Sequence, residues 1–275
     1  MDAINGINQI NPRILGDENI RKAKAGYSET VYGLFDDENK GVNGQIDEEV
    51  FQGQKGDCWL ISGILSLSYD DKGKELIKDA IGQNPDGSYS VYFKGIDKEY
   101  TVTKEELERN NKSTLMNGLG ITNSSYSTGD DDMLLIELAL EKLVSEGEVP
   151  IETLDGITGG SAYYLYELFT DNMTGYAYGD DEEEMANLLN YYNQYQDDCS
   201  AVLGVDEGFG SLEDDHAYAV KEINGQYMTL VNPWDTTKEI NVSIEELKDN
   251  FGSYDFSLAD NELKEESNWL EENYA

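Results

Sequence analysis

The hydrophobic pattern changes along the chain, from the spacing typical of helices to the alternation typical of strands. The clearest amphipathic helix is expected over residues 131–145, where acidic residues open the segment and Gly147 closes it. After Gln196, the segments CSAVLGV, HAYAVKEING and QYMTLVNPW are typical of consecutive strands, with Asn224-Gly225 as a hairpin turn. Helices followed by antiparallel strands predict an α+β chain with a helical N-terminal lobe and a β-rich C-terminal lobe.

The chain divides into three expected parts. Residues 1–48 are polar and rich in Gly and Asn, which predicts an irregular extension with a short helix near residues 20–32. Residues 49–172 form the helical lobe, and residues 173–275 form the β-rich lobe. The extension precedes the two lobes, so we interpret it as a candidate prosegment that occupies the site between them.

Composition excludes several classes of protein. Asp and Glu number 57 against 19 Lys and Arg, so the formal charge is −38. Such a charge disfavours nucleic acid and anionic membranes as partners, because both attract cations. The sequence shows no apolar run of membrane-spanning length and no signal peptide, which predicts a cytoplasmic protein or one exported by a signal-less route. With two Cys and one His, a disulfide scaffold and a multi-histidine zinc site are also excluded.

The few nucleophilic residues that remain form a consistent set. Cys58 follows Gly-Asp at the expected start of an apolar helix, where the helix dipole and free N–H groups favour the thiolate. The only base of suitable type is His216, at the head of a strand, and Asn232 follows where the next strand ends. Antiparallel pairing can therefore bring Asn232 beside the imidazole, which would present its other nitrogen to the thiol. Gln52, six residues before the thiol, is a candidate donor to a developing oxyanion.

These segments resemble a known family. QGQKGDCWL is similar to the calpain version of the papain-type nucleophile motif, and HAYAV and LVNPW resemble the calpain His strand and Asn-Pro-Trp segment. MLLIELALEKLVSEG and GITGG also resemble the helical lobe of calpain cores. The resemblance spans about residues 52–254 and implies a papain-like two-lobed fold, with the active site in the cleft between a helical and an antiparallel β lobe.

The resemblance also implies an activity and a role for each residue. A stand-alone calpain-like thiol protease would hydrolyse peptide bonds in protein or peptide substrates through a thioester acyl-enzyme. Cys58 would be the nucleophile, His216 the base and then the acid, Asn232 the residue that orients His216, and Gln52 part of the oxyanion hole. Trp234 would shield the His–Asn hydrogen bond from water. The chemistry requires no cofactor.

Calcium is a candidate regulator, because calpain cores bind Ca²⁺ in each lobe. The acidic loops offer four candidate ligands of the oxygen type that Ca²⁺ prefers: Asp206, Glu207, Glu213 and Asp214. In a chain with 57 acidic residues, clusters of this kind also arise from composition alone.

Some departures from the family and two alternative functions stay open. Asp235 follows Trp234 where the family has Gly, and Asp171-Asn172 replaces the family's second double glycine, so no substrate-binding glycine is assigned. One alternative is another papain-like acyl transferase or amidase, such as a transglutaminase-type enzyme. The other is a catalytically silent acidic binding protein. Substrate preference and oligomeric state are not readable from the sequence.

Overall fold

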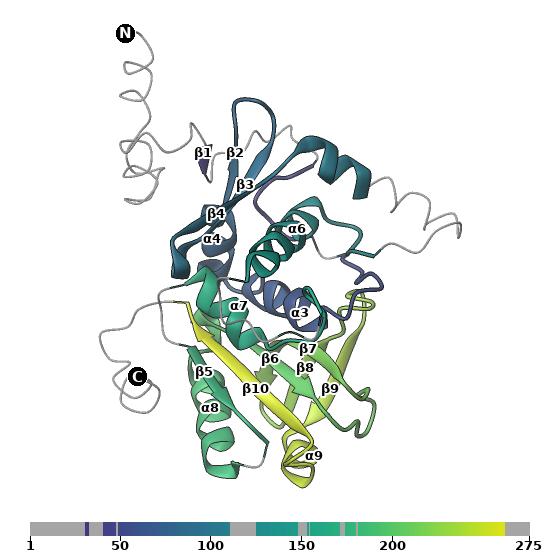
Figure 1. The fold of residues 1–275 in the computed structure, drawn as a ribbon. Coiled ribbons are helices and arrows are strands. Elements are labelled where there is room, and N and C mark those ends of the chain that lie inside the picture. Colours follow the sequence, from purple (N-terminus) through teal and green to yellow (C-terminus); the bar gives the residue numbers. More distant parts are fainter. Residues whose placement is uncertain are drawn as a thin grey trace.

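The computed structural model describes residues 31–32, 41–47, 49–110, 125–147, 153, 155–170, 174–179 and 181–261. This part of the chain combines helices with two antiparallel sheets (Figure 1), so the predicted α+β class is confirmed.

The first sheet lies in the N-terminal half and has the strand order β1-β2-β3-β4. Its strands are β1 (Val31–Tyr32), β2 (Ile81–Gln83), β3 (Tyr89–Phe93) and β4 (Lys98–Val102). β3 and β4 form a hairpin, which the short 3₁₀ turn η1 (Lys94–Ile96) joins, while Gly87 lies in the preceding turn with φ 86°. The half expected to be helical therefore also carries a sheet. Residues 31–32 are a strand and not the end of a helix; the rest of that predicted helix lies outside the described residues.

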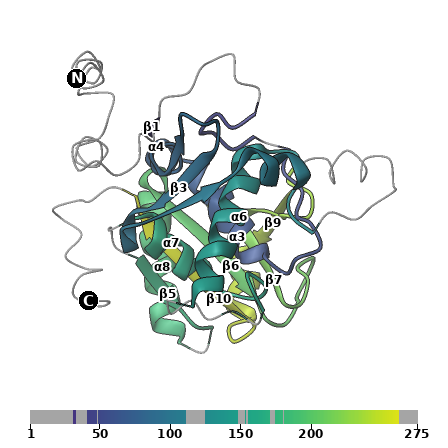
Figure 2. The ribbon, with the colours of Figure 1, turned by 45° about the horizontal axis from the view of Figure 1, so that its top comes forward.

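Helices accompany this sheet: α3 (Cys58–Leu67), α4 (Asp71–Ala80), α6 (Asp131–Glu146) and α7 (Ala162–Phe169). Residues 104–110, just after β4, are helical as well. The predicted ends of α6 are confirmed: Asp130 accepts the Met133 N–H at 2.6 Å, and Gly147 takes the left-handed conformation with φ 65°. Figure 2 shows α3 and α6 next to each other near the centre of the molecule.

The second sheet has six strands in the order β5-β10-β6-β7-β8-β9. The strands are β5 (Thr174–Ala177), β6 (Cys199–Val205), β7 (His216–Asn224), β8 (Tyr227–Val231), β9 (Glu239–Ser243) and β10 (Tyr254–Asp260). Further elements of this half are α8 (Glu182–Tyr195), η2 (Gln196–Asp198) and α9 (Ile244–Asp249). Ser243 caps α9, because its Oγ accepts the Glu246 N–H at 3.0 Å. The hairpin turn lies one residue later than expected, because Asn224 still pairs with Tyr227 and the turn is Gly225-Gln226.

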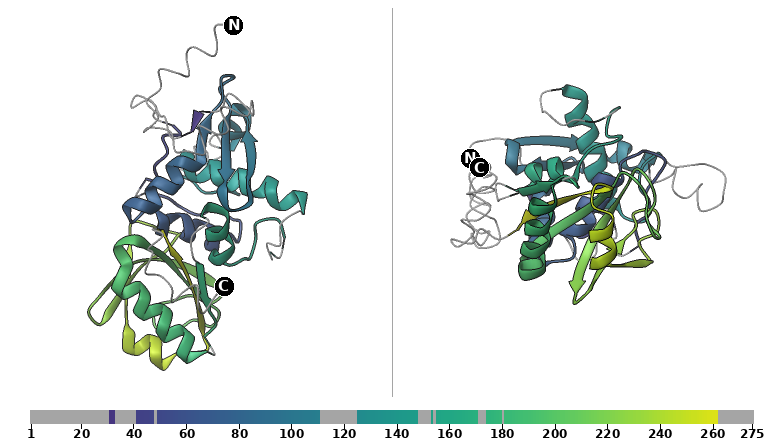
Figure 3. Two further views of the ribbon diagram at one scale, coloured as in Figure 1. Left: turned by 90° about the vertical axis from the view of Figure 1, so that its left-hand side faces the viewer. Right: turned by 90° about the horizontal axis from the view of Figure 1, so that it is seen from below.

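The central strands of the second sheet, β10, β6, β7 and β8, are buried on both faces, and their side chains alternate between two hydrophobic cores. Ala217 and Ala219 of β7 join the core that contains α3, α6 and α7, whereas Tyr218 and Val220 join the core that contains α8. The small alanine side chains let α3 lie close to the strand. As Figures 1 and 3 show, α3 lies between the rest of the N-terminal half and the second sheet.

Only a small part of the candidate prosegment belongs to the described residues. Asp132, in the first turn of α6, accepts the N–H groups of Asn43 and Gly44 at 2.8 and 2.9 Å, and Asp130 accepts that of Asp47 at 2.7 Å. Asp130 and Asp132 therefore fix residues 43–47 against the start of α6.

Candidate active site

Cys58 is the first residue of α3 and lies against the start of β7. Ala219 pairs with Val231, the last residue of β8, so Ala217 lies past the end of that strand. The backbone N–H and carbonyl of Ala217 have no partner in β8 and face α3. The N–H donates to the Cys58 sulfur, and the carbonyl accepts Ser62 Oγ at 3.0 Å. Because Ser62 lies one helical turn after Cys58, these two contacts fix the helix face that carries the thiol toward β7.

His216 and Asn232 are brought together by strand pairing, as expected. His216 opens β7 and Asn232 follows the last residue of β8, and the distance from His216 Nε2 to Asn232 Oδ1 is 2.9 Å. The Trp234 N–H also donates to Asn232 Oδ1, at 2.9 Å. Because this second donor identifies the oxygen of the amide, Nε2 of His216 must carry a proton. The Nδ1 lone pair is then left for another partner.

Aromatic rings enclose the imidazole of His216. The Trp234 ring stacks on it with centroids 3.9 Å apart and an angle of 28°, and the Tyr218 ring meets it edge-on at 4.9 Å. Tyr218 is itself fixed, since its hydroxyl accepts the Glu213 N–H at 2.8 Å. Trp234 remains 49% exposed, whereas His216 is 4% exposed. Trp234 therefore covers one face of the imidazole, the position expected for a side chain that shields it from water.

Burial dominates the acid–base properties of this pair. It raises the pKa of the Cys58 thiol, and the nearby Asp57 carboxylate adds to this, against N–H groups that include that of Ala217. Burial also lowers the pKa of His216, partly offset by the bond to Asn232 and the charge of Glu213. The sequence suggested a helix terminus that favours the thiolate, but in the folded protein both shifts favour an uncharged thiol and imidazole.

Gln52 lies on a loop that is tied to both halves of the chain. Its N–H donates to the Pro233 carbonyl at 2.8 Å, beside the Asn-Pro-Trp segment. Its side-chain Nε2 donates to the Lys55 carbonyl at 2.8 Å and to Asp57 Oδ1 at 3.1 Å, while its Oε1 is buried without a hydrogen-bond partner. Both amide protons are thus used within the loop, and the oxyanion role of Gln52 stays a prediction.

A buried pair of acids next to Cys58 was not anticipated from the sequence. Asp57 and Glu137 are both 0% exposed, and each carboxyl affects the pKa of the other. The available signal was Glu137 itself, a charged residue on the apolar face of the segment MLLIELAL.

The four candidate calcium ligands all belong to the described residues. Asp214 Oδ1 accepts the Gly208 N–H at 2.6 Å. Burial raises the pKa of Asp206, and the charges of Asp215 and Glu207 add to this. Within the described ranges, no three His, Cys, Asp or Glu side chains are placed to hold a metal ion. Calcium as a regulator stays a prediction, and we derive no step through a metal. The other cysteine, Cys199, is a buried residue of β6, as expected for a core position.

Comparison with known proteins adds no family to this geometry. No protein-family model matches the chain, and a search of curated proteins finds none that is similar to it. Among the helices of the described residues, none has the length and apolar character that a bilayer crossing requires. Any functional conclusion therefore depends on the site.

Proposed function

We propose that the protein is a calpain-like cysteine endopeptidase with a papain-like arrangement of its two halves. The observation that carries this proposal is the His216–Asn232 hydrogen bond, which leaves Nδ1 of the only histidine available at the strand end that contacts Cys58. A structural histidine would not need its second nitrogen free beside a cysteine at a helix start. The substrates would be proteins or peptides.

The proposed reaction uses each group of this set in turn. The Cys58 sulfur attacks the substrate carbonyl while His216 Nδ1 takes the thiol proton. His216 then gives that proton to the leaving amine, and a thioester with Cys58 forms. Water attacks the thioester, with His216 again as base, and releases the acid and the thiol. Asn232 keeps the imidazole in the tautomer that this sequence of transfers requires.

Stabilisation of the oxyanion is the step whose hydrogen-bond donors are least fixed in position. The N–H groups at the start of α3 point toward developing negative charge, as at any helix N-terminus. Gln52 would contribute if its Nε2–H turned from the Lys55 carbonyl toward the substrate while the bond to Asp57 was kept. In this proposal that change accompanies substrate binding, and Gln52 Oε1, which has no partner among the described residues, gives up no bond.

Hydrolysis of an unfolded, basic protein substrate tests the proposal most directly, with and without Ca²⁺ and with a chelator. We expect cleavage by the full chain, none by Cys58→Ala or His216→Ala, and unchanged cleavage by the control Cys199→Ala. Mass spectrometry of a slowly hydrolysed peptide ester should show an acyl adduct on Cys58. Fold retention is checked by circular dichroism of each variant.

The products separate the alternatives. Incorporation of a free amine without hydrolysis would instead indicate a transglutaminase-type acyl transferase. Absence of both cleavage and acyl adduct under every condition would contradict the proposal and favour an acidic binding protein.

A further inference from the structure

We propose that Asp57 and Glu137 share a single proton and act together as a positioning pair for the side-chain amide of Gln52. This inference rests on the proposed function, because the orientation of Gln52 matters for catalysis only in acyl transfer. It gives a role to two buried acids that take no part in the reaction proposed for Cys58, His216 and Asn232.

The conformation of Asp57 is the first observation. An Asp that precedes a helix normally caps it by accepting an N–H from the first turn. Asp57 makes no such bond, although it is the N-cap residue of α3. Its Oδ1 accepts Nε2 of Gln52 instead, at 3.1 Å, so the side chain serves the loop and not the helix.

The surroundings of the pair require a shared proton. Asp57 Oδ2 is buried and receives no N–H or O–H from a neighbouring group among the described residues. Glu137 faces Asp57, and both of its oxygens accept the backbone N–H of Ser127, at 3.0–3.1 Å, while Oε2 also accepts the Ser127 hydroxyl. Two carboxylates cannot bond to each other without a proton between them. Since Ser127 donates to Glu137 and Gln52 donates to Asp57 Oδ1, the oxygen that lacks a donor is Asp57 Oδ2, and a proton between the two acids would supply it.

The charge balance favours one proton over none or two. Burial and the facing Asp57 raise the pKa of Glu137 well above its ordinary value, while burial raises the pKa of Asp57 to about 6. Because the two groups face each other, these shifts belong to the pair, which keeps one proton where two separate carboxyls would have lost both. The other groups that face the pair are Lys55, the nearest cation, together with Tyr126 and Glu141.

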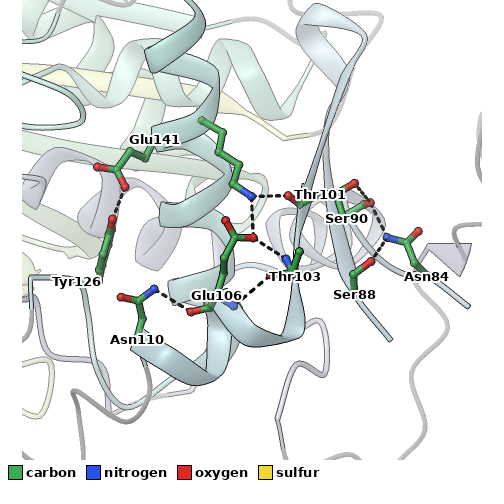
Figure 4. Close-up of polar contacts among 10 residues, drawn as sticks. Asn84, Ser88, Ser90, Thr101, Thr103, Glu106, Asn110, Tyr126 and Glu141 are labelled. Atoms are coloured by element: carbon green, nitrogen blue, oxygen red, sulfur yellow. Dashed lines mark hydrogen bonds and ion pairs between the residues drawn. The ribbon is translucent and has the colours of Figure 1, made fainter. Parts of the chain in front are cut away.

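These neighbours already have partners of their own. Lys55 forms an ion pair with Glu141 and lies over the Tyr126 ring, 4.4 Å from its centroid. The Tyr126 hydroxyl donates to Glu141, as Figure 4 shows. The cation is thus committed to Glu141, and a proton is what neutralises the Asp57–Glu137 pair.

The geometry gives the pair a specific role. Glu137 lies at the centre of α6, where the Ser127 N–H donates to it, and it faces Asp57. Asp57 in turn accepts Nε2 of Gln52 and so orients that amide in the loop before Cys58. Loss of the shared proton at alkaline pH would set two negative charges against each other and release this hold on Gln52.

The test compares Glu137→Gln with Glu137→Met in the full chain. Gln can donate to Asp57 and accept from Ser127, so it mimics the protonated acid, whereas Met of similar size can do neither. The control is Glu146→Gln, the same change at an exposed position of α6 that accepts the Tyr100 hydroxyl. Two quantities are measured: the protons released on unfolding near pH 7, from the pH dependence of urea denaturation, and kcat and KM for a peptide substrate across pH.

We expect Glu137→Gln to release about one proton fewer on unfolding than wild type and Glu146→Gln. It should keep kcat within about threefold and lose the alkaline decline in rate, whereas Glu137→Met should lose kcat at least tenfold with little change in KM. If Glu137→Met does not fold, the number of protons released on unfolding and the pH dependence of kcat, compared between Glu137→Gln and Glu146→Gln, still test the shared proton.

Failure of this inference differs from failure of the proposed function. An unchanged proton count in Glu137→Gln, with wild-type cleavage intact, would overturn the shared proton alone. Loss of kcat in Glu137→Gln as large as in Glu137→Met would overturn it as well, because a charged carboxylate would then be required. If wild type neither cleaves nor acylates, the positioning role falls with the proposed function, while the proton count still decides the shared proton.

Discussion

Substitution of Asn232 perturbs the site at the contact that defines its tautomer. In Asn232→Ala the Nε2–H of His216 loses its acceptor, and His216 is 4% exposed, so water reaches it poorly. A buried donor without a partner costs about 1–3 kcal/mol, and we expect the free energy of unfolding to fall by about 2 kcal/mol. The Trp234 N–H loses the same acceptor but lies at an exposed residue, where water replaces it at little cost.

Asn232→Asp is the matched variant. A carboxylate retains an acceptor for both His216 and Trp234, so the unfolding free energy should stay closer to that of wild type. The added negative charge opposes the burial that lowers the pKa of His216 and should raise that pKa. In Asn232→Ala the pKa should fall further, because the bond to Asn232 supports the charged imidazole.

Nitrogen-15 NMR measures the tautomer and the pKa of His216 directly, because the chain contains a single histidine and its signals do not overlap with those of another. Wild type should show the Nε2–H tautomer and a pKa below the ordinary value of 6.5. The tautomer preference should be lost in Asn232→Ala and kept in Asn232→Asp. A wild-type Nδ1–H tautomer, or a pKa that does not change between the two variants, would refute the reasoning that Asn232 orients the imidazole.

Three further predictions concern stability and are measured by urea denaturation. Burial raises the pKa of Asp132 to about 8, so the folded protein retains a proton that the unfolded chain releases above about pH 4. The free energy of unfolding should therefore fall between about pH 4 and pH 8. Asp132→Asn should make this fall smaller. Asp70→Ala removes the cap of α4 and one acceptor each of Ser200 Oγ and Asn261 Nδ2, and should cost about 3 kcal/mol, whereas a loss below about 1 kcal/mol would contradict this account. Gly160→Ala places a Cβ 2.7 Å from the Trp59 ring and should cost about 1–3 kcal/mol, unless the glycine loop moves freely.

Sequence periodicity predicted the elements whose burial is regular. The helices α3, α6 and α8 and the strands β6, β7 and β8 lie where their apolar patterns place them, because each has a continuous buried face. The strands β5 and β10 were not predicted. β10 lies between β5 and β6 and pairs with residues 49 to 85 positions earlier in the chain, so its position is set by long-range pairing and not by a local signal.

The site divides in the same way. The meeting of His216 and Asn232 could be predicted because it follows from one hairpin, β7 and β8, whose two strands the sequence indicates although the turn lies one residue later than predicted. The bond between Asp57 and Glu137 could not, because it depends on how α6 packs against the start of α3. The same holds for the Gln52 amide, which lies toward Lys55 and Asp57 through loop contacts that no periodicity encodes.

The burial that stabilises the junction of α3 and β7 also determines how Cys58 should react. Because burial raises the pKa of Cys58 and lowers that of His216, the resting pair is uncharged, and thiolate forms mainly as pH rises. Alkylation of Cys58 should therefore accelerate with pH through neutrality and beyond, without a plateau, while buried Cys199 reacts slowly at every pH. His216→Ala should change this profile little, since a neutral imidazole contributes no stabilising charge to the resting thiolate. A fast plateau below pH 7 that disappears in His216→Ala would refute the uncharged pair and indicate a resting thiolate–imidazolium ion pair.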